Sequence, residues 1–187
     1  MLTIVFAPSL VLLQKAKRVL KIDKSVTNLI EEMKETLDNT KDPQGVGLAA
    51  PQIGKSLQIF VIKPTANSKH SVFINPMIEE LINDAQKTSP KRKSVSSRKD
   101  KKLEGCLSIP SVWGFVKRKP KIILSYMDEQ GTHHKKTFTG FFATIIQHEY
   151  DHLQGVLFPK RVLEGKNKLY KSRKNEENED VFEELEI

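Results

Sequence analysis

The sequence predicts one α+β domain, in which antiparallel β-sheets surround a helix near the carboxy terminus. A length of 187 residues suits a single domain that can bury a core without disulfides. Helical periodicity is strongest in one early and one late segment, whereas β-branched and aromatic runs dominate the middle. A helix, several strands and a second helix, with no internal repeat, are typical of this fold class.

The first helix is predicted over residues 25–40. Asp23 or Ser25 can cap its start, and the sequence "KDPQG" ends it. Charged residues separate apolar residues that recur at helical spacing, so one face of the helix packs on a core. These apolar residues are Val26, Leu29, Ile30, Met33 and Leu37.

The following segment, "GVGLAAPQIG" (45–54), is predicted to be a loop because its glycines and proline prevent a regular helix. Strands are predicted where β-branched and aromatic runs are bounded by turn residues. They are "LQIFVIK" (57–63), "SVFIN" (71–75) and "KIILSY" (121–126), with "DEQG" as a hairpin turn after the third.

The formal net charge of +8 is unevenly distributed along the chain. Residues 84–102 are basic, rich in Ser and poor in hydrophobics, so they cannot offset the entropy of ordering, and we expect a mobile insertion. The chain ends in acidic residues, and we expect a charged tail over 166–187 after a domain of residues 1–165. A basic RNA- or ribosome-binding module is an alternative, although the insertion lacks interleaved aromatic residues for base stacking.

The single cysteine, Cys106, excludes an intramolecular disulfide and favours a reducing compartment. Pro8 interrupts the apolar amino-terminal stretch, and neither a basic segment before it nor a small-residue cleavage pattern after it indicates a signal or transit peptide. No apolar run approaches the length of a transmembrane helix. We therefore expect a cytoplasmic protein that does not enter a membrane.

The second helix is predicted over residues 141–154, where Gly155 is placed to end it. It contains "QHEYDHLQG", in which His148 and His152 lie one turn apart and can reach one ion together. Glu149 can approach a metal-bound water without being a ligand, which is the general-base role in HExxH enzymes. Along one helix face the histidines continue an apolar stripe, which consists of Phe141, Ile145, His148 and His152.

The histidine pair by itself allows several interpretations. A pattern this short also arises by chance on a solvated helix face. The longer metzincin pattern fails because Phe158 stands where its third histidine belongs. A zinc peptidase that cleaves internal peptide bonds would need a downstream carboxylate, and Glu164 is the nearest. The other candidate is Cys106 in "LEGCLSIP" (103–110), since one thiolate and two imidazoles leave a tetrahedral ion one position for water. A lone cysteine can equally be a small buried hydrophobe.

Three short stretches occur in order: "GVGLAAPQ" (45–52), "EGCLS" (104–108) and "QHEYDH" (147–152). In these the sequence resembles the peptide deformylase family, and the resemblance covers roughly residues 3–165. The opening "APSLVLLQKAKRV" is also similar, although Ser9 and Leu10 replace the usual Asp-Pro. The basic insertion and the charged tail depart from the family, but both lie outside the three stretches that carry the resemblance.

The resemblance implies a hydrolase that removes the formyl group from the N-formylmethionine of nascent polypeptides and releases formate. It implies one divalent metal ion per chain, held by Cys106, His148 and His152. The native ion is expected to be Fe2+, while Zn2+, Ni2+ or Co2+ can occupy such a donor set in the purified protein. The implied partners are N-formylmethionyl nascent peptides and, transiently, the ribosome; specific DNA binding is not expected.

The resemblance also assigns roles around the ion. Glu149 would carry the proton, while the side-chain amide of Gln52 and the backbone N–H of Leu107 would stabilise the anion that forms on the formyl oxygen. Glu104 and Arg118 match positions that pair and steady the cysteine loop.

The substrate would lie against main-chain groups left bare by Gly45, Val46 and Gly47. Val46, Phe141 and Ile145 are candidates for the methionine pocket, and the two helix residues among them could equally be plain core. The remaining histidines, His70, His133 and His134, are predicted to be solvated and not to bind metal.

Overall fold

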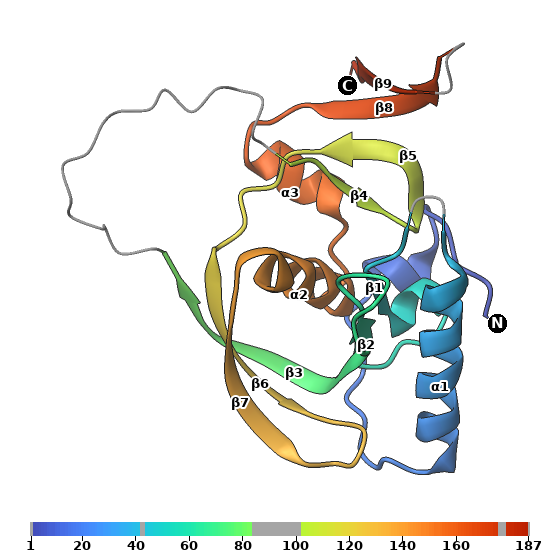
Figure 1. Ribbon diagram of the computed structural model, residues 1–187, viewed down its shortest axis with the longest axis vertical. Coiled ribbons are helices and arrows are strands. Elements are labelled where there is room, and N and C mark those ends of the chain that lie inside the picture. Colours follow the sequence, from blue (N-terminus) through green and yellow to red (C-terminus); the bar gives the residue numbers. More distant parts are fainter. Residues whose placement is uncertain (1, 42–43, 84–101, 176–178, 187) are drawn as a thin grey trace.

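The structure of the chain is a computed structural model that describes residues 2–41, 44–83, 102–175 and 179–186 (Figure 1). Most of the basic insertion predicted over 84–102 lies outside the described residues. Among the described residues, no helix is both long and apolar enough to cross a membrane. The elements in chain order are η1 (Leu10–Leu13), α1 (Lys24–Asn39), β1 (Gly47–Ala49), η2 (Ala50–Ile53), β2 (Ile59–Ile62), β3 (Ser71–Ile82), β4 (Glu104–Cys106), β5 (Ile109–Gly114), β6 (Lys121–Met127), β7 (His133–Thr139), α2 (Gly140–Leu153), α3 (Phe158–Glu164), β8 (Leu169–Lys174) and β9 (Asp180–Glu184).

Helix α1 confirms the early amphipathic segment. Asp23 is its cap, because one carboxylate oxygen accepts from the backbone N–H groups of Ser25 at 2.9 Å and Val26 at 3.1 Å. The predicted apolar residues form its buried face, which packs against β1 and β2. Amphipathic spacing therefore placed this helix correctly, and packing of one face holds it on the sheet.

The larger sheet is antiparallel, with the strand order β1-β2-β3-β6-β7. The glycine-rich segment predicted to be a loop instead contributes strand β1 and the short 3-10 helix η2, because Gly47 to Ala49 pair with Ile62 to Phe60 of β2. The predicted turn "DEQG" is confirmed between β6 and β7, with Gly131 at φ +81°.

Strand β3 runs past the end that the sequence predicts. The expected strand stops before Pro76, but the structure continues to Ile82 through a shift of register between Ile74 and Met77. Such a bulge accommodates a proline without a ladder N–H and leaves Asn75 at φ +49°. The Asn75 side chain then bonds both the N–H and the C=O of Val19, at 2.8 Å each.

The smaller sheet has the order β4-β5-β8-β9, and its last two strands come from the segment predicted to be a charged tail. Basic β8 lies antiparallel to acidic β9, so opposite charges meet across the pair. Lys174 and Asp180 pair at 3.0 Å, and Arg173 contacts Glu183 in the same way. The basic and acidic residues of the segment predicted to be a charged tail therefore pair with each other within a hairpin.

Helix α2 confirms the late helix and lies between the two sheets (Figure 1). Gly155 follows it at φ +70°, where its Cβ-free backbone lets the chain pass within contact distance of Leu13. A cluster of buried residues joins α2 to the larger sheet, and a second cluster packs α3 under the smaller one. The middle of α2 is thus held between layers, which fixes the side chains that it presents to β4.

Candidate active site

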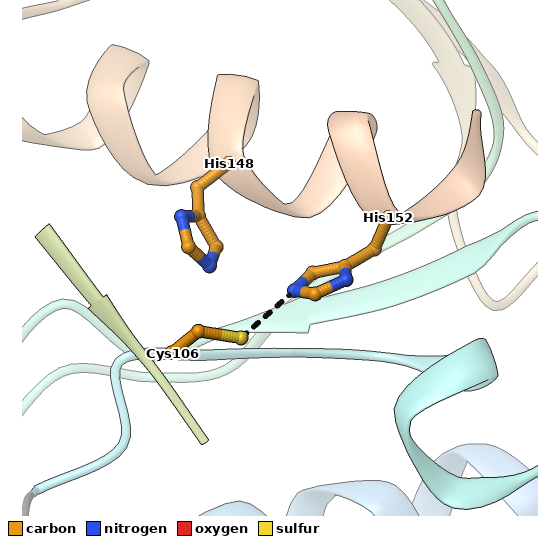
Figure 2. A group of neighbouring side chains, drawn as sticks. All are labelled: Cys106, His148 and His152. Carbon is orange, nitrogen blue, oxygen red and sulfur yellow. Dashed lines mark hydrogen bonds between the residues drawn. The ribbon is translucent and has the colours of Figure 1, made fainter. Parts of the chain in front are cut away.

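Three predicted metal ligands converge between β4 and α2. Cys106 ends β4, while His148 and His152 lie on successive turns of α2, and all three side chains point into the same space (Figure 2). One ligand atom from each lies within 4.8 Å of the other two, and the Cys106 Sγ is 3.2 Å from the His152 Nε2. Cys106 and His152 are buried, so the group is enclosed by the fold.

The chemistry of this group fits a divalent cation. Burial alone would raise the pKa of the Cys106 thiol, but the imidazoles of His152 and His148 hold it well below its usual value. The thiolate is the form that binds metal. Two buried atoms of the site, the Nδ1 of His152 and the Oε2 of Glu149, have no hydrogen-bond partner among the described residues. A thiolate with two imidazoles is a donor set that suits Fe2+, Co2+, Ni2+ or Zn2+.

Glu149 lies next to the ligands and is 3% exposed. Burial raises the pKa of its carboxyl above the usual value, although the neighbouring imidazoles act in the opposite direction. Its side chain packs directly on the backbone of β1, because a Cβ built on Gly47 would stand 2.3 Å from the Glu149 Oε1. A buried carboxyl of raised pKa, placed beside a metal group, is suited to proton transfer near neutral pH.

Gln52 is brought to the same place by η2 and is 1% exposed. Its Oε1 accepts from the backbone N–H of Ala49 at 2.8 Å, which turns its Nε2 toward Ser108 Oγ at 3.4 Å and Cys106 Sγ at 3.6 Å. The amide donor therefore faces the ligand group. Leu107 follows the cysteine directly and lines a cavity that opens beside the ligand group.

A chain of buried ion pairs supports the first histidine. His148 Nδ1 lies 3.1 Å from Glu104, whose carboxylate receives two bonds of 2.9 Å from Arg118. The predicted pairing of Glu104 with Arg118 is thus present. Arg118 also donates to Asp151 at 2.6 Å, and Asp151 in turn accepts from Arg161 at 2.8 Å. An Nδ1–H that donates to Glu104 leaves the Nε2 of His148 to face the ligand group.

The sequence analysis did not identify two residues of this series of ion pairs, Asp151 and Arg161. The position of Asp151 between the two histidines of "QHEYDH" is the signal that could have marked it. No local pattern marks Arg161, which reaches Asp151 from α3.

A cavity of about 250 Å³ opens beside the ligand group. All five residues predicted to bind substrate line it, from the β1 side and from α2. Ile145 is buried and belongs to the core as well, whereas Phe141 is 52% exposed at the cavity and is not core. Further lining residues that the sequence did not mark are Gln44, Leu103, Trp113 and Thr144.

The competing third ligand, Glu164, lies elsewhere. It ends α3 and pairs with Arg161 at 3.0 Å, outside the group formed by the cysteine and the two histidines. Phe158 is buried and stacks on His148, with ring centroids 6.2 Å apart. The structure therefore gives the peptidase interpretation no carboxylate ligand from this position.

The remaining histidines lie away from the ligand group. His133 is exposed. His70 lies 3.0 Å from Asp38 and His134 lies 2.6 Å from Asp128, so these two are in acidic contacts and are not simply solvated.

The sequence model of the polypeptide deformylase family matches residues 1–168 of this chain. The chain belongs to the polypeptide deformylase family. It is a hydrolase that removes the N-terminal formyl group from nascent polypeptides. A peptide deformylase of Pseudothermotoga lettingae is 42% identical over 148 residues, which cover 79% of this chain and 75% of that relative. One of Borreliella burgdorferi is 39% identical over 168 residues, which cover 89% of this chain and 92% of that relative.

Solved structures of other family members share the fold of this chain. The crystal structure of a peptide deformylase from Synechococcus elongatus in complex with actinonin is 38% identical, with a TM-score of 0.71, and the match covers 86% of this chain and 78% of that one. One from Legionella pneumophila is 33% identical with a TM-score of 0.72, over 86% of this chain and 85% of that one.

Proposed function

We propose that this chain deformylates N-formylmethionyl nascent peptides with one divalent ion held by Cys106, His148 and His152. The observation that carries this assignment is the convergence of their ligand atoms, within 4.8 Å of one another, from β4 and two turns of α2. Three protein ligands leave a tetrahedral ion one position for water, as a hydrolytic site needs and a structural site does not. When bound, the ion lowers the pKa of that water and polarises the formyl carbonyl.

The proton transfer of the reaction is assigned to Glu149. Its Oε2 is buried and without a hydrogen-bond partner among the described residues, and its pKa is raised by burial. The carboxylate takes a proton from the water that attacks the formyl carbon, and it gives this proton to the methionine nitrogen as the C–N bond breaks and formate leaves. The contact with Gly47 holds the carboxylate between β1 and α2, so its reach is set by the backbone.

Stabilisation of the anion that forms on the formyl oxygen is assigned to Gln52 and Leu107. The Gln52 amide is fixed through its Oε1, so its Nε2 needs no reorganisation to donate. The backbone N–H of Leu107 is the second donor. Each such donor lowers the barrier by about 3 kcal/mol when it is aimed at the developing charge.

The peptide is proposed to lie as an added strand. Both β1 and β4 are terminal strands of their sheets, and both line the cavity. Main-chain pairing along Gly45, Val46 and Gly47 recognises backbone and so tolerates many sequences. Val46, Phe141 and Ile145 supply apolar surface for the methionine side chain.

Fe2+ is proposed as the native ion, with Zn2+, Ni2+ or Co2+ as substitutes, since this donor set accepts them all. A transient association with the ribosome is proposed because the substrate emerges there, and the net charge of +8 would favour contact with RNA. We also propose a cytoplasmic location, in which a bacterial-type chain of this family would meet its nascent substrates.

Formate release tests the assignment. Metal-loaded protein and Glu149→Gln are compared on formyl-Met-Ala, with acetyl-Met-Ala as the control substrate. We expect the wild type to release formate from formyl-Met-Ala, and kcat to be about 10²- to 10⁴-fold lower in Glu149→Gln at unchanged metal content. Wild-type turnover by Glu149→Gln would overturn the role of the carboxylate. Absence of formate from fully loaded wild-type protein would overturn the proposed function.

A further inference from the structure

Trp113 forms a wall of the cavity and is the only tryptophan of the chain. It lies on β5 directly opposite Gly105, the residue before the ligand Cys106. Its six-membered ring covers the Gly105 backbone, because a Cβ built there would stand 2.8 to 3.1 Å from three carbons of the ring. The apolar face of the indole therefore covers the residue that directly precedes Cys106.

The orientation of this ring depends on the hairpin of β8 and β9. The Trp113 Nε1 donates to the Oγ of Ser172 at 3.0 Å, and the ring meets the edge of Phe182 with centroids 6.0 Å apart and planes at 87°. Ser172 and Phe182 are directly opposite each other in the β8–β9 pair. Trp113 pairs with Tyr170 of β8, so Ser172 is its diagonal neighbour on the same face of the sheet.

This hairpin lies beyond the residues that the family model matches. The family match ends at residue 168, and β8 begins at Leu169. Strand β9 is exposed along its whole length, and Phe182 keeps 43% of its surface exposed while it contacts the indole. A contact with the cavity wall is thus made by residues that follow the family match.

We propose that Trp113 determines specificity for the residues that follow formylmethionine, and that Ser172 and Phe182 are positioning residues for its ring. This inference rests on the proposed function. A peptide whose formyl group lies at the ligand group, and which lies in the cavity lined by both β1 and β4, advances about 3.3 Å per residue, so its next side chains come level with Gly105 and the indole. The indole face offers apolar contact area there, which favours an aromatic or large apolar side chain.

Kinetics on two substrates test the specificity. Metal-loaded wild type, Trp113→Ala, Ser172→Ala and Phe182→Ala are compared on formyl-Met-Ala and formyl-Met-Phe. We expect the wild type to prefer formyl-Met-Phe, and Trp113→Ala to reduce the ratio of the two kcat/KM values about three- to tenfold, chiefly through KM. Ser172→Ala and Phe182→Ala should reduce it in the same direction by less. Val181→Ala, one residue along β9, is the matched control and should keep the wild-type ratio.

Fluorescence tests the positioning without turnover. Because Trp113 is the only tryptophan, emission reports on this ring alone. With Zn2+ as the ion, Ser172→Ala and Phe182→Ala should move the emission maximum to longer wavelength as the ring gains water, whereas Val181→Ala should not. Circular dichroism confirms that each variant is folded, and Trp113→Phe replaces Trp113→Ala in the kinetics if the latter is not.

The outcomes separate the two proposals. An unchanged substrate ratio in the Trp113 variant overturns the specificity role. Wild-type emission in both hairpin variants overturns the positioning role. If the wild type releases no formate at all, the proposed function fails instead, while the emission shifts still decide whether the hairpin holds the ring.

Discussion

Glu149 occupies the space that a side chain on Gly47 would need. A Cβ at Gly47 would stand 2.3 Å from the Oε1 and 2.7 Å from the carboxyl carbon of Glu149. Strand β1 and helix α2 therefore approach each other closely because residue 47 is a glycine. The close approach places the proposed proton carrier against the strand along which the substrate is proposed to lie.

Gly47→Ala should reduce kcat for formyl-Met-Ala by about 10²-fold, because displacement of a catalytic group by about 1 Å has this order of effect. Bound metal should stay at the wild-type level, since the three atoms nearest to the new methyl group all belong to Glu149. Gly165→Ala is the control, because its Cβ would meet chiefly the movable end of Asn167. Wild-type kcat in Gly47→Ala would show that Glu149 works equally well from a shifted position.

Cys106→Ala should abolish stable metal binding, because two imidazoles alone leave the ion half coordinated. Metal content after dialysis, measured by elemental analysis, should drop from about one ion per chain to a small fraction of that. Glu164→Ala should keep its metal, because Glu164 pairs with Arg161 and lies outside the ligand group. The opposite pattern, with metal kept in the cysteine variant and lost in the glutamate variant, would favour the peptidase interpretation.

Gln52→Leu should lower kcat by about 10²- to 10³-fold with little change in KM, since its amide is proposed to act on charge that develops only during reaction. Steady-state kinetics on formyl-Met-Ala measure this. Gln130→Leu, in the exposed turn after β6, provides the control. A rise in KM at constant kcat would instead indicate that Gln52 binds the ground state.

Arg118→Met should destabilise the protein by about 3 to 5 kcal/mol, because it leaves the buried carboxylates of Glu104 and Asp151 without their shared partner. Urea unfolding of the metal-free protein measures the loss. Lys174→Met removes an exposed pair with Asp180 and should change stability by no more than about 1 kcal/mol. Equal effects of the two substitutions would mean that burial does not distinguish these ion pairs.

Acid should destabilise the metal-free protein partly through Glu104. Burial alone would raise the pKa of this carboxyl, but His148 and Arg118 hold it below its ordinary value of 4.5. A depressed pKa means that the unfolded chain binds the proton first, so the stabilisation is complete above pH 4.5 and is lost as the pH falls through the lower folded pKa. Thermal melts from pH 6 to pH 3 should show a shallower decline for Glu104→Gln than for the wild type. Parallel curves would contradict this linkage.

Local sequence signals were sufficient to predict several parts of this protein. Spacing predicted α1, with Asp23 or Ser25 as its cap, and it placed His148 and His152 on one face of α2. The three stretches that resemble the family predicted Cys106 as a metal ligand and Gln52 as a hydrogen-bond donor, and the structure brings these two residues together although they are far apart along the chain. Each of these follows from helical periodicity or from a short motif that is readable without knowing what packs against it.

Contacts between groups that are distant in the sequence could be identified only from the folded chain. The charged segment after Lys166 became β8 and β9 because each strand finds its register only on its neighbours, and a local pattern of charge cannot specify that pairing. Likewise Arg161 reaches Asp151 from another helix, and Trp113 is oriented by Ser172 across a sheet. Contacts between elements depend on how whole layers pack, so their partners are set by the fold and not by neighbouring residues in the sequence.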